Sequence, residues 1–155
     1  MKTALFAGSF DPMTLGHLDI IERTAKLCGK VYVGLADNVT KASPVFPLTK
    51  REEMVKLATK KLPHVEVIPI EGLLVAFAKK HKVDLLVRSL RPGADMSHEF
   101  AMATANKQMS GIDTIFLVAD PAVAFISSTL VREIYLAGGN LQGFIPPELL
   151  PFFKA

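Results

Sequence analysis

The sequence lacks the features that mark secreted, membrane-spanning or disulfide-stabilised chains. Its 155 residues include one cysteine, Cys28, so no intramolecular disulfide can form and a reducing compartment is indicated. The amino terminus, MKTALFAGSFDP, reaches a glycine, an aspartate and a proline before a signal segment could form. No stretch approaches the roughly 18 consecutive apolar residues of a membrane span. We therefore expect a soluble, cytoplasmic protein with no membrane partner.

A strong charge bias is also absent. The 18 Lys and Arg against 15 Asp and Glu give a net charge of +3, which is too mild to indicate nucleic-acid binding. Half of the residues are hydrophobic and 21% are charged, which excludes a disordered chain. The length predicts one domain, residues 1–155, able to bury a core without metal or disulfides.

Short apolar runs alternate with helix-like segments along the whole chain. The predicted strands are 3–7, 31–35, 65–70, 84–88 and 114–118, with Pro69 favouring a sheet edge for the third. The predicted helices are 17–28 ended by Gly29, 49–61 opened by a Thr49–Glu52 capping box, 73–81, 97–109, and Ser127 or Ser128 to 137. This order predicts an α/β fold with a doubly wound, five-stranded parallel sheet, Rossmann-like, whose ligands bind beyond the carboxyl ends of the strands.

The turn after the first predicted strand has the character of a phosphate site. Gly8 is followed by Ser9-Phe10-Asp11-Pro12, and Gly16-His17 opens the next helix. The pattern is neither the dinucleotide motif nor the P-loop. However, small residues let the backbone approach a phosphate, and a helix N-terminus offers free N–H groups and partial positive charge. We interpret His17 as a donor to a bound anion rather than only a helix-end structural residue.

Two further segments follow strands or open helices. Arg88-Ser89-Leu90-Arg91 carries two guanidinium groups, which match phosphate oxygens bidentately. The alternative is a surface salt bridge of these arginines with Asp84, Asp95 or Glu99. Ser127-Ser128-Thr129, followed by Arg132, indicates either ordinary helix caps or a second anion-binding helix end.

Together these segments predict a polyphosphate site. It has two helix N-termini, hydroxyls, arginines and one histidine, with no evident metal cage and no recognisable Ser-His-Asp or Cys-His set. Gly8-Ser9-Phe10-Asp11-Pro12 with Gly16-His17 resembles the S/T-F-D-P-x-x-x-G-H signature of the nucleotidyltransferase superfamily. RSLR (88–91) and ISST-x-x-R (126–132) stand at the expected distances. The closest resemblance, over essentially the whole chain, is to the bacterial phosphopantetheine adenylyltransferases.

That resemblance implies AMP transfer from ATP to 4′-phosphopantetheine, giving dephospho-coenzyme A and pyrophosphate, with Mg²⁺ bound mainly through ATP phosphates and water. The catalytic residues it implies are His17, Lys41 and Arg91. The ATP-binding residues it implies are Gly8, Ser9, Phe10, His17, Ser89, Arg91, Glu99, Ser127, Ser128 and Thr129. The residues it implies for the acceptor are Ser9, Lys41, Leu73, Leu74, Arg88 and Asn106. It further implies a homohexamer and coenzyme A as a possible inhibitor.

The charge of the substrates explains the missing nucleophile–base pair. A phosphate monoester carries about −1.5 to −2 charge at neutral pH, so it attacks without a general base. The obstacle is repulsion between two polyanions, which positioning and positive charge overcome. Two alternatives remain open on the sequence: a nicotinate or nicotinamide mononucleotide adenylyltransferase or a cytidylyltransferase, and a non-catalytic nucleotide-binding module.

Overall fold

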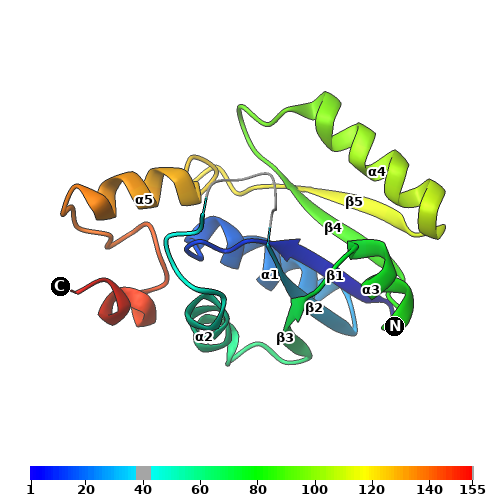
Figure 1. Cartoon of the computed structure of the whole chain (residues 1–155), viewed down its shortest axis with the longest axis horizontal. Coiled ribbons are helices and arrows are strands. Elements are labelled where there is room, and N and C mark those ends of the chain that lie inside the picture. Colours follow the sequence, from blue (N-terminus) through cyan, green and yellow to red (C-terminus); the bar gives the residue numbers. More distant parts are fainter. Residues whose placement is uncertain (38–42, 155) are drawn as a thin grey trace.

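The computed structural model describes residues 1–37 and 43–154, and its strands and helices alternate until two helical segments follow one another near the carboxyl end (Figure 1). The strands are β1 Thr3–Gly8, β2 Lys30–Ala36, β3 Val65–Ile70, β4 Leu85–Leu90 and β5 Asp113–Val118. The helices are α1 Leu15–Leu27, α2 Leu48–Thr59, α3 Leu74–Lys80, α4 Met96–Ser110, α5 Ser128–Leu136 and a final 3₁₀ helix η1 Pro147–Phe153. The predicted α/β class is confirmed.

The five strands form one parallel sheet in the order β3-β2-β1-β4-β5. The chain builds outward from β1 through β2 to β3 and then returns to place β4 on the other side of β1. The strand order therefore reverses between β1 and β4, which is where such sheets bind ligands. Pro69 lies in β3 at the sheet edge, where the missing N–H costs no ladder bond, as predicted.

The period-two alternation of the strands separates two apolar layers. Ala4 and Phe6 of β1 belong to the larger core, which also contains buried residues of α1, α2, α5 and η1. Leu5 of β1 belongs to the smaller core on the other face, against α3 and the start of β4. In Figure 1, α5 lies beyond the end toward which β1 points, and α3 lies near the amino terminus. No helix in the described part of the chain has the length and apolar character that crossing a membrane requires.

The predicted start of the second helix is wrong, whereas the first helix ends before Gly29, as predicted, but in another conformation than a glycine stop implies. The carbonyl of Pro47 accepts from the N–H groups of Lys50 and Arg51 at 3.0 and 3.1 Å, so α2 begins before Thr49 and the predicted capping box does not form. Gly29 is not a left-handed helix stop, because Cys28 ends α1 in an extended conformation and the chain enters β2 directly. A Cβ at Gly29 would collide with Met1, so the glycine permits a close approach rather than a turn.

Gly138, by contrast, follows α5 with a φ of 76°, the left-handed conformation that commonly ends helices, and α5 stops where the sequence predicts. The fourth strand extends to Leu90, two residues beyond its predicted end. Arg88 therefore lies inside β4, and Arg91 is the first residue after it. The two arginines consequently occupy different depths along the sheet.

Candidate active site

A cavity of about 840 Å³ lies at the carboxyl ends of β1 and β4, where the strand order reverses. It is lined by parts of all three predicted segments, from the turn after β1, the end of β4 and the start of α5. The predicted residues that line it are Gly8, Ser9, His17, Arg88, Ser89, Arg91, Glu99, Ser128 and Thr129. Residues more than 110 positions apart in the sequence therefore share one concave surface.

Other predicted residues lie elsewhere. Lys41 is outside the residues that the structure describes. Phe10 is buried in the larger core with a φ of 47°, and its ring contacts that of His17 with 4.9 Å between centroids. Ser127 lines a neighbouring cavity of about 630 Å³, which shares Arg91 with the first. These positions test no role, so the roles remain predictions.

Three of the residues predicted for the acceptor do not line the 840 Å³ cavity. Leu73 precedes α3 and is 56% exposed. Leu74 packs against the smaller core, and Asn106 is buried in α4. An acceptor that contacts these residues would have to extend out of the cavity along the face that carries α3 and α4.

The local structure of the α1 N-terminus fixes the tautomer of His17. Thr14 caps the helix, and its backbone N–H donates to His17 Nδ1 at 3.0 Å. Because a backbone N–H can only donate, Nδ1 is the acceptor and the ring proton of the neutral imidazole is on Nε2. The histidine is thus held in the form that can donate from Nε2.

The charge state of His17 follows from its surroundings. Burial and, secondarily, the nearby positive charge of Arg91 lower its pKa to about 4. The ring is therefore neutral at physiological pH. A neutral donor stabilises negative charge that develops during a reaction, without first forming a strong ion pair with the ground state.

Four arginines line the cavity, and three of them are in ion pairs with acids that also line it. The pairs are Arg51–Asp37 at 2.6 Å, Arg88–Glu99 at 3.0 Å and Arg132–Asp11 at 4.0 Å. Within residues 1–37 and 43–154, Arg91 is the lining arginine with no carboxylate partner, and its NH1 is 3.5 Å from the Ile126 carbonyl. Arg91 is therefore the arginine most available to an anionic ligand.

The pairing of Arg88 confirms one of the two sequence interpretations in part. Its Nε and NH2 donate to the two carboxylate oxygens of Glu99, each at 3.0 Å, and the ion pair lowers the pKa of Glu99. Asp84 pairs with Lys2 instead, and Asp95 caps α4. The Arg88–Glu99 pair faces the cavity, so Arg88 is positioned to meet a phosphate even though a carboxylate already orients it.

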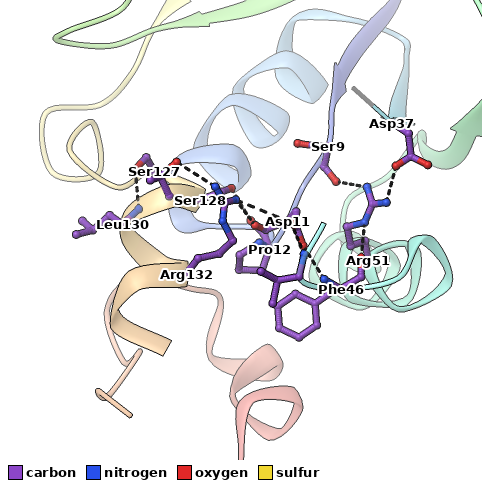
Figure 2. A network of polar contacts seen from close by, with 12 residues as sticks. Ser9, Asp11, Pro12, Asp37, Phe46, Arg51, Ser127, Ser128, Leu130 and Arg132 are labelled. Atoms are coloured by element: carbon purple, nitrogen blue, oxygen red, sulfur yellow. Dashed lines mark hydrogen bonds and ion pairs between the residues drawn. The ribbon is translucent and has the colours of Figure 1, made fainter. Parts of the chain in front are cut away.

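The hydroxyls at the start of α5 have partners in the protein (Figure 2). Ser127 is the N-cap and accepts from the Leu130 N–H at 3.0 Å. Ser128 donates to the Pro12 carbonyl at 2.8 Å, and Thr129 accepts from Arg132 at 3.1 Å. The ordinary-cap interpretation is confirmed for Ser127, whereas Ser128 and Thr129 line the cavity.

Sequence analysis missed the network beneath the cavity. Asp11 is buried and accepts from the N–H groups of Val45 and Phe46, both at 2.9 Å, and Arg51 is 1% exposed. Figure 2 shows Asp11 and Arg51 converging on Phe46. An arginine in a charged helix normally faces solvent, so only contacts between distant segments reveal that Arg51 is buried. Asp11 stood in the quoted motif, but no sequence signal gave it a partner.

A metal cage is not part of the described site. Within the two described ranges, no three His, Cys, Asp or Glu side chains come together as a metal-binding group. Three of the acids that line the cavity, Asp11, Asp37 and Glu99, are paired with arginines, and Asp95 caps α4. The remaining N–H donors suit phosphate oxygens rather than a cation. The chemistry that this donor set supports is the binding and transfer of a phosphate-containing group.

Comparison with known proteins supports this chemistry. Residues 5–134 match the model of the cytidylyltransferase-like family. The phosphopantetheine adenylyltransferase of Rhizorhabdus wittichii is 43% identical over 151 residues, 97% of this chain and 91% of that protein. The one of Thermobifida fusca is 44% identical over 147 residues, 95% of this chain and 89% of that protein.

Solved structures show the same fold. A candidate nicotinate-nucleotide adenylyltransferase from Vibrio parahaemolyticus has a TM-score of 0.68 at 19% identity and covers 99% of both chains. A lipopolysaccharide core biosynthesis protein from Thermoplasma volcanium has a TM-score of 0.58 at 20% identity, covering 77% of this chain and 97% of that one. At these identities the likeness concerns the fold alone.

Proposed function

The chain belongs to the cytidylyltransferase-like family and, within it, to the phosphopantetheine adenylyltransferases, and from this premise we propose how its cavity transfers AMP from ATP to 4′-phosphopantetheine. The products are dephospho-coenzyme A and pyrophosphate. The single observation that carries the mechanism is the geometry of His17, a neutral donor held at a helix N-terminus close to the positive charge of Arg91.

Charge governs the reaction. The acceptor phosphate attacks the α-phosphorus of ATP in line and breaks the bond to pyrophosphate, with no proton to remove from the nucleophile. His17 donates from Nε2 to a non-bridging α-phosphate oxygen as negative charge develops there. The site's remaining task is to hold two polyanions together, which the arginines and the two helix N-termini accomplish.

Arg88 and Arg91 lie at different positions along β4, which suggests that each binds a different substrate. Arg88 lies within β4, with NH1 3.4 Å from the Ala7 carbonyl at the end of β1, and serves the acceptor phosphate. Arg91 lies after β4 and lines both cavities, so it serves the ATP phosphates. The second cavity, lined by Pro121, Phe125 and neighbouring residues, offers an apolar surface for the adenine.

We propose that Mg²⁺ enters the site bound to the nucleotide. We expect ATP oxygens and water to hold Mg²⁺, which neutralises part of the polyphosphate charge. Asp37 and Glu99 at the cavity are each already paired with an arginine, which supports this proposal. The roles implied for Lys41, Leu73, Leu74 and Asn106 in acceptor binding are retained as proposals.

The proposal extends to assembly and regulation. Apolar side chains of α4 and β5 are exposed in the single chain, which supports burial between copies in a homohexamer; they include Met96, Phe100, Met102, Met109, Ile115 and Val118. Coenzyme A contains the same phosphopantetheine portion as the acceptor, so it competes for the acceptor site. We also place the reaction in the cytoplasm, a proposal with which the low cysteine content agrees, since Cys28 is the one cysteine of the sequence.

Pyrophosphate release in the presence of ATP and one of three acceptors tests the proposal. We expect turnover with 4′-phosphopantetheine and little with nicotinamide mononucleotide or glycerol 3-phosphate. Faster turnover of nicotinamide mononucleotide would make the chain a different adenylyltransferase. ATP binding with no pyrophosphate release from any acceptor would favour a non-catalytic nucleotide-binding module.

A further inference from the structure

Arg51 is the largest fully buried side chain of the described residues, although it is charged. Burial of an unpaired guanidinium is costly, so its partners must be held in place. Its Nε donates to the Phe46 carbonyl at 3.0 Å, NH1 to the Ser9 carbonyl at 2.8 Å and NH2 to Asp37 Oδ1 at 2.6 Å. All three nitrogens are engaged, and the planar group cannot rotate without breaking at least one bond.

The three partners of Arg51 come from three different segments around the cavity. Ser9 follows β1, Asp37 follows β2, and Phe46 precedes α2 (Figure 2). Phe46 is held a second time, because Asp11 accepts from its N–H at 2.9 Å. Arg51 therefore binds the carbonyl of Phe46 while Asp11 binds its N–H, so both backbone groups of Phe46 are held. This fixes the segment that carries Ser43 and Pro44, which line the cavity, relative to Ser9.

The ion pair between Arg51 and Asp37 also affects the charge of the cavity wall. Its side chain is 61% exposed and lines the cavity in which two polyanions are expected to meet. A free carboxylate there would repel phosphates, whereas a carboxylate bonded to Arg51 forms a neutral pair. The buried cation therefore removes a repulsive charge from the cavity wall.

We propose that Arg51 is a positioning residue of this site, which holds the Ser9 turn against the Phe46 segment and neutralises Asp37 beside the bound phosphates. It touches no reacting atom and acts through Ser9 and Asp37. The inference rests on the proposed function only in that polyanionic ligands occupy the cavity. The two proposed roles of Arg51 require different chemistry. Any cation can neutralise Asp37, whereas holding Ser9 and Phe46 together requires the three donating nitrogens of the guanidinium.

Affinity measurements on variants separate the two parts. Calorimetry with ATP and with inorganic tripolyphosphate should show Arg51→Met binding about 10- to 100-fold more weakly than the wild type. Asp37→Asn added to Arg51→Met should recover about 10-fold, because it removes the exposed charge. The matched control is Lys56→Met, which makes the same charge change on the exposed surface of α2, where Lys56 pairs with Glu52. Its affinities should stay within about twofold of the wild type.

Arg51→Lys tests the positioning part and serves where Arg51→Met fails to fold. Its ammonium can pair with Asp37 but cannot also reach Ser9 and Phe46, so we expect ATP affinity within about threefold and a kcat about 10-fold lower. A folded Arg51→Met that Asp37→Asn does not improve would overturn the neutralising role, and a wild-type kcat for Arg51→Lys would overturn the positioning role. Absence of turnover in the wild type would instead contradict the proposed function, and absence of tripolyphosphate and ATP binding would contradict both.

Discussion

At the scale of single residues, the way in which α1 begins determines which nitrogen of His17 carries the ring proton. The bond from the Thr14 N–H to Nδ1 caps the helix and at the same time directs the ring proton to Nε2. Burial then keeps the ring neutral. The sequence predicted a histidine donor at a helix start, but it could not show the tautomer or the pKa, because both depend on the folded surroundings.

Replacement of His17 by Ala tests its role as a donor to the transition state. We expect kcat to fall about 10²–10³-fold, the usual cost of one lost oxyanion donor. The KM for ATP should change little, because the ground-state contacts of the phosphates survive. Steady-state kinetics with Thr14→Ser as the control for the helix cap provides the measurement. Weak ATP binding combined with normal turnover at saturation would reduce His17 to a binding residue.

The pKa of His17 gives a pH prediction with a definite sign. In the unfolded chain a histidine titrates near 6.5, whereas His17 in the folded protein titrates at about 4. Between these values the unfolded state binds more protons, so this group lowers stability as the pH falls from about 6.5 to 4. NMR titration of the ligand-free protein should place the His17 ring transition near pH 4. A transition near 6.5 would show that the ring is solvated.

The two arginines predict a separation of the Michaelis constants. Arg88→Ala should raise the KM for phosphopantetheine more than that for ATP, and Arg91→Ala should do the reverse. A lost charge-assisted contact of roughly 1.5–3 kcal/mol corresponds to about 10–150-fold, so the contrast is measurable. Arg→Lys at either position should restore only part of the loss, because an ammonium lacks the bidentate fork. Equal shifts of both constants in both variants would make the arginines structural ion-pair members.

At the scale of elements, type and order were predictable and boundaries were less so. β3 was predicted at both ends because VEVIPI is bounded by polar and glycine-containing segments. α2 was mispredicted at its start because Thr49-x-x-Glu52 has the capping-box letters, while Pro47 supplies the carbonyl that opens the helix earlier. Several neighbouring residues can each begin a helix, and only the backbone hydrogen bonds of the folded chain show which one does.

The cap of α5 supplies a prediction at this scale. The Ser127 hydroxyl accepts from the Leu130 N–H, so Ser127→Ala leaves that donor without its partner. Loss of such a cap costs about 1 kcal/mol, or roughly 2–4 °C in Tm for a chain of this size. Thermal unfolding of Ser127→Ala beside Ser127→Thr, which keeps the oxygen, measures the effect. An unchanged Tm for both variants would mean that water replaces the hydroxyl at no cost.

At the scale of the whole molecule, the place of the site followed from topology. Parallel strands with a reversal between β1 and β4 direct ligands to their carboxyl ends, and the predicted segments meet there. The topology did not, however, predict which charged side chains pair with one another. Arg51 pairs with Asp37, which is 14 positions away, and Arg132 pairs with Asp11, which is 121 positions away. No local pattern specifies which acid neutralises which arginine across such separations.

Assembly is testable at the same scale. The exposed apolar side chains of α4 and β5 should be covered in a homohexamer, and native mass spectrometry should give a mass six times the 16.9 kDa of one chain. Phe100→Glu, which places a charge on a side chain that is 60% exposed in the single chain, should lower the oligomeric state. A monomer at micromolar concentration in the unmodified protein would contradict the proposed hexamer.

We propose that this cavity joins the AMP portion of ATP directly to a phosphate acceptor without a general base. The most direct test of this proposal follows the label from α-³²P-ATP incubated with 4′-phosphopantetheine and Mg²⁺. We expect the label to appear in dephospho-coenzyme A in amounts equal to the pyrophosphate released, and His17→Ala to slow both equally. Label recovered as free AMP, or transfer of the γ-phosphate in place of the α-phosphate, would contradict it.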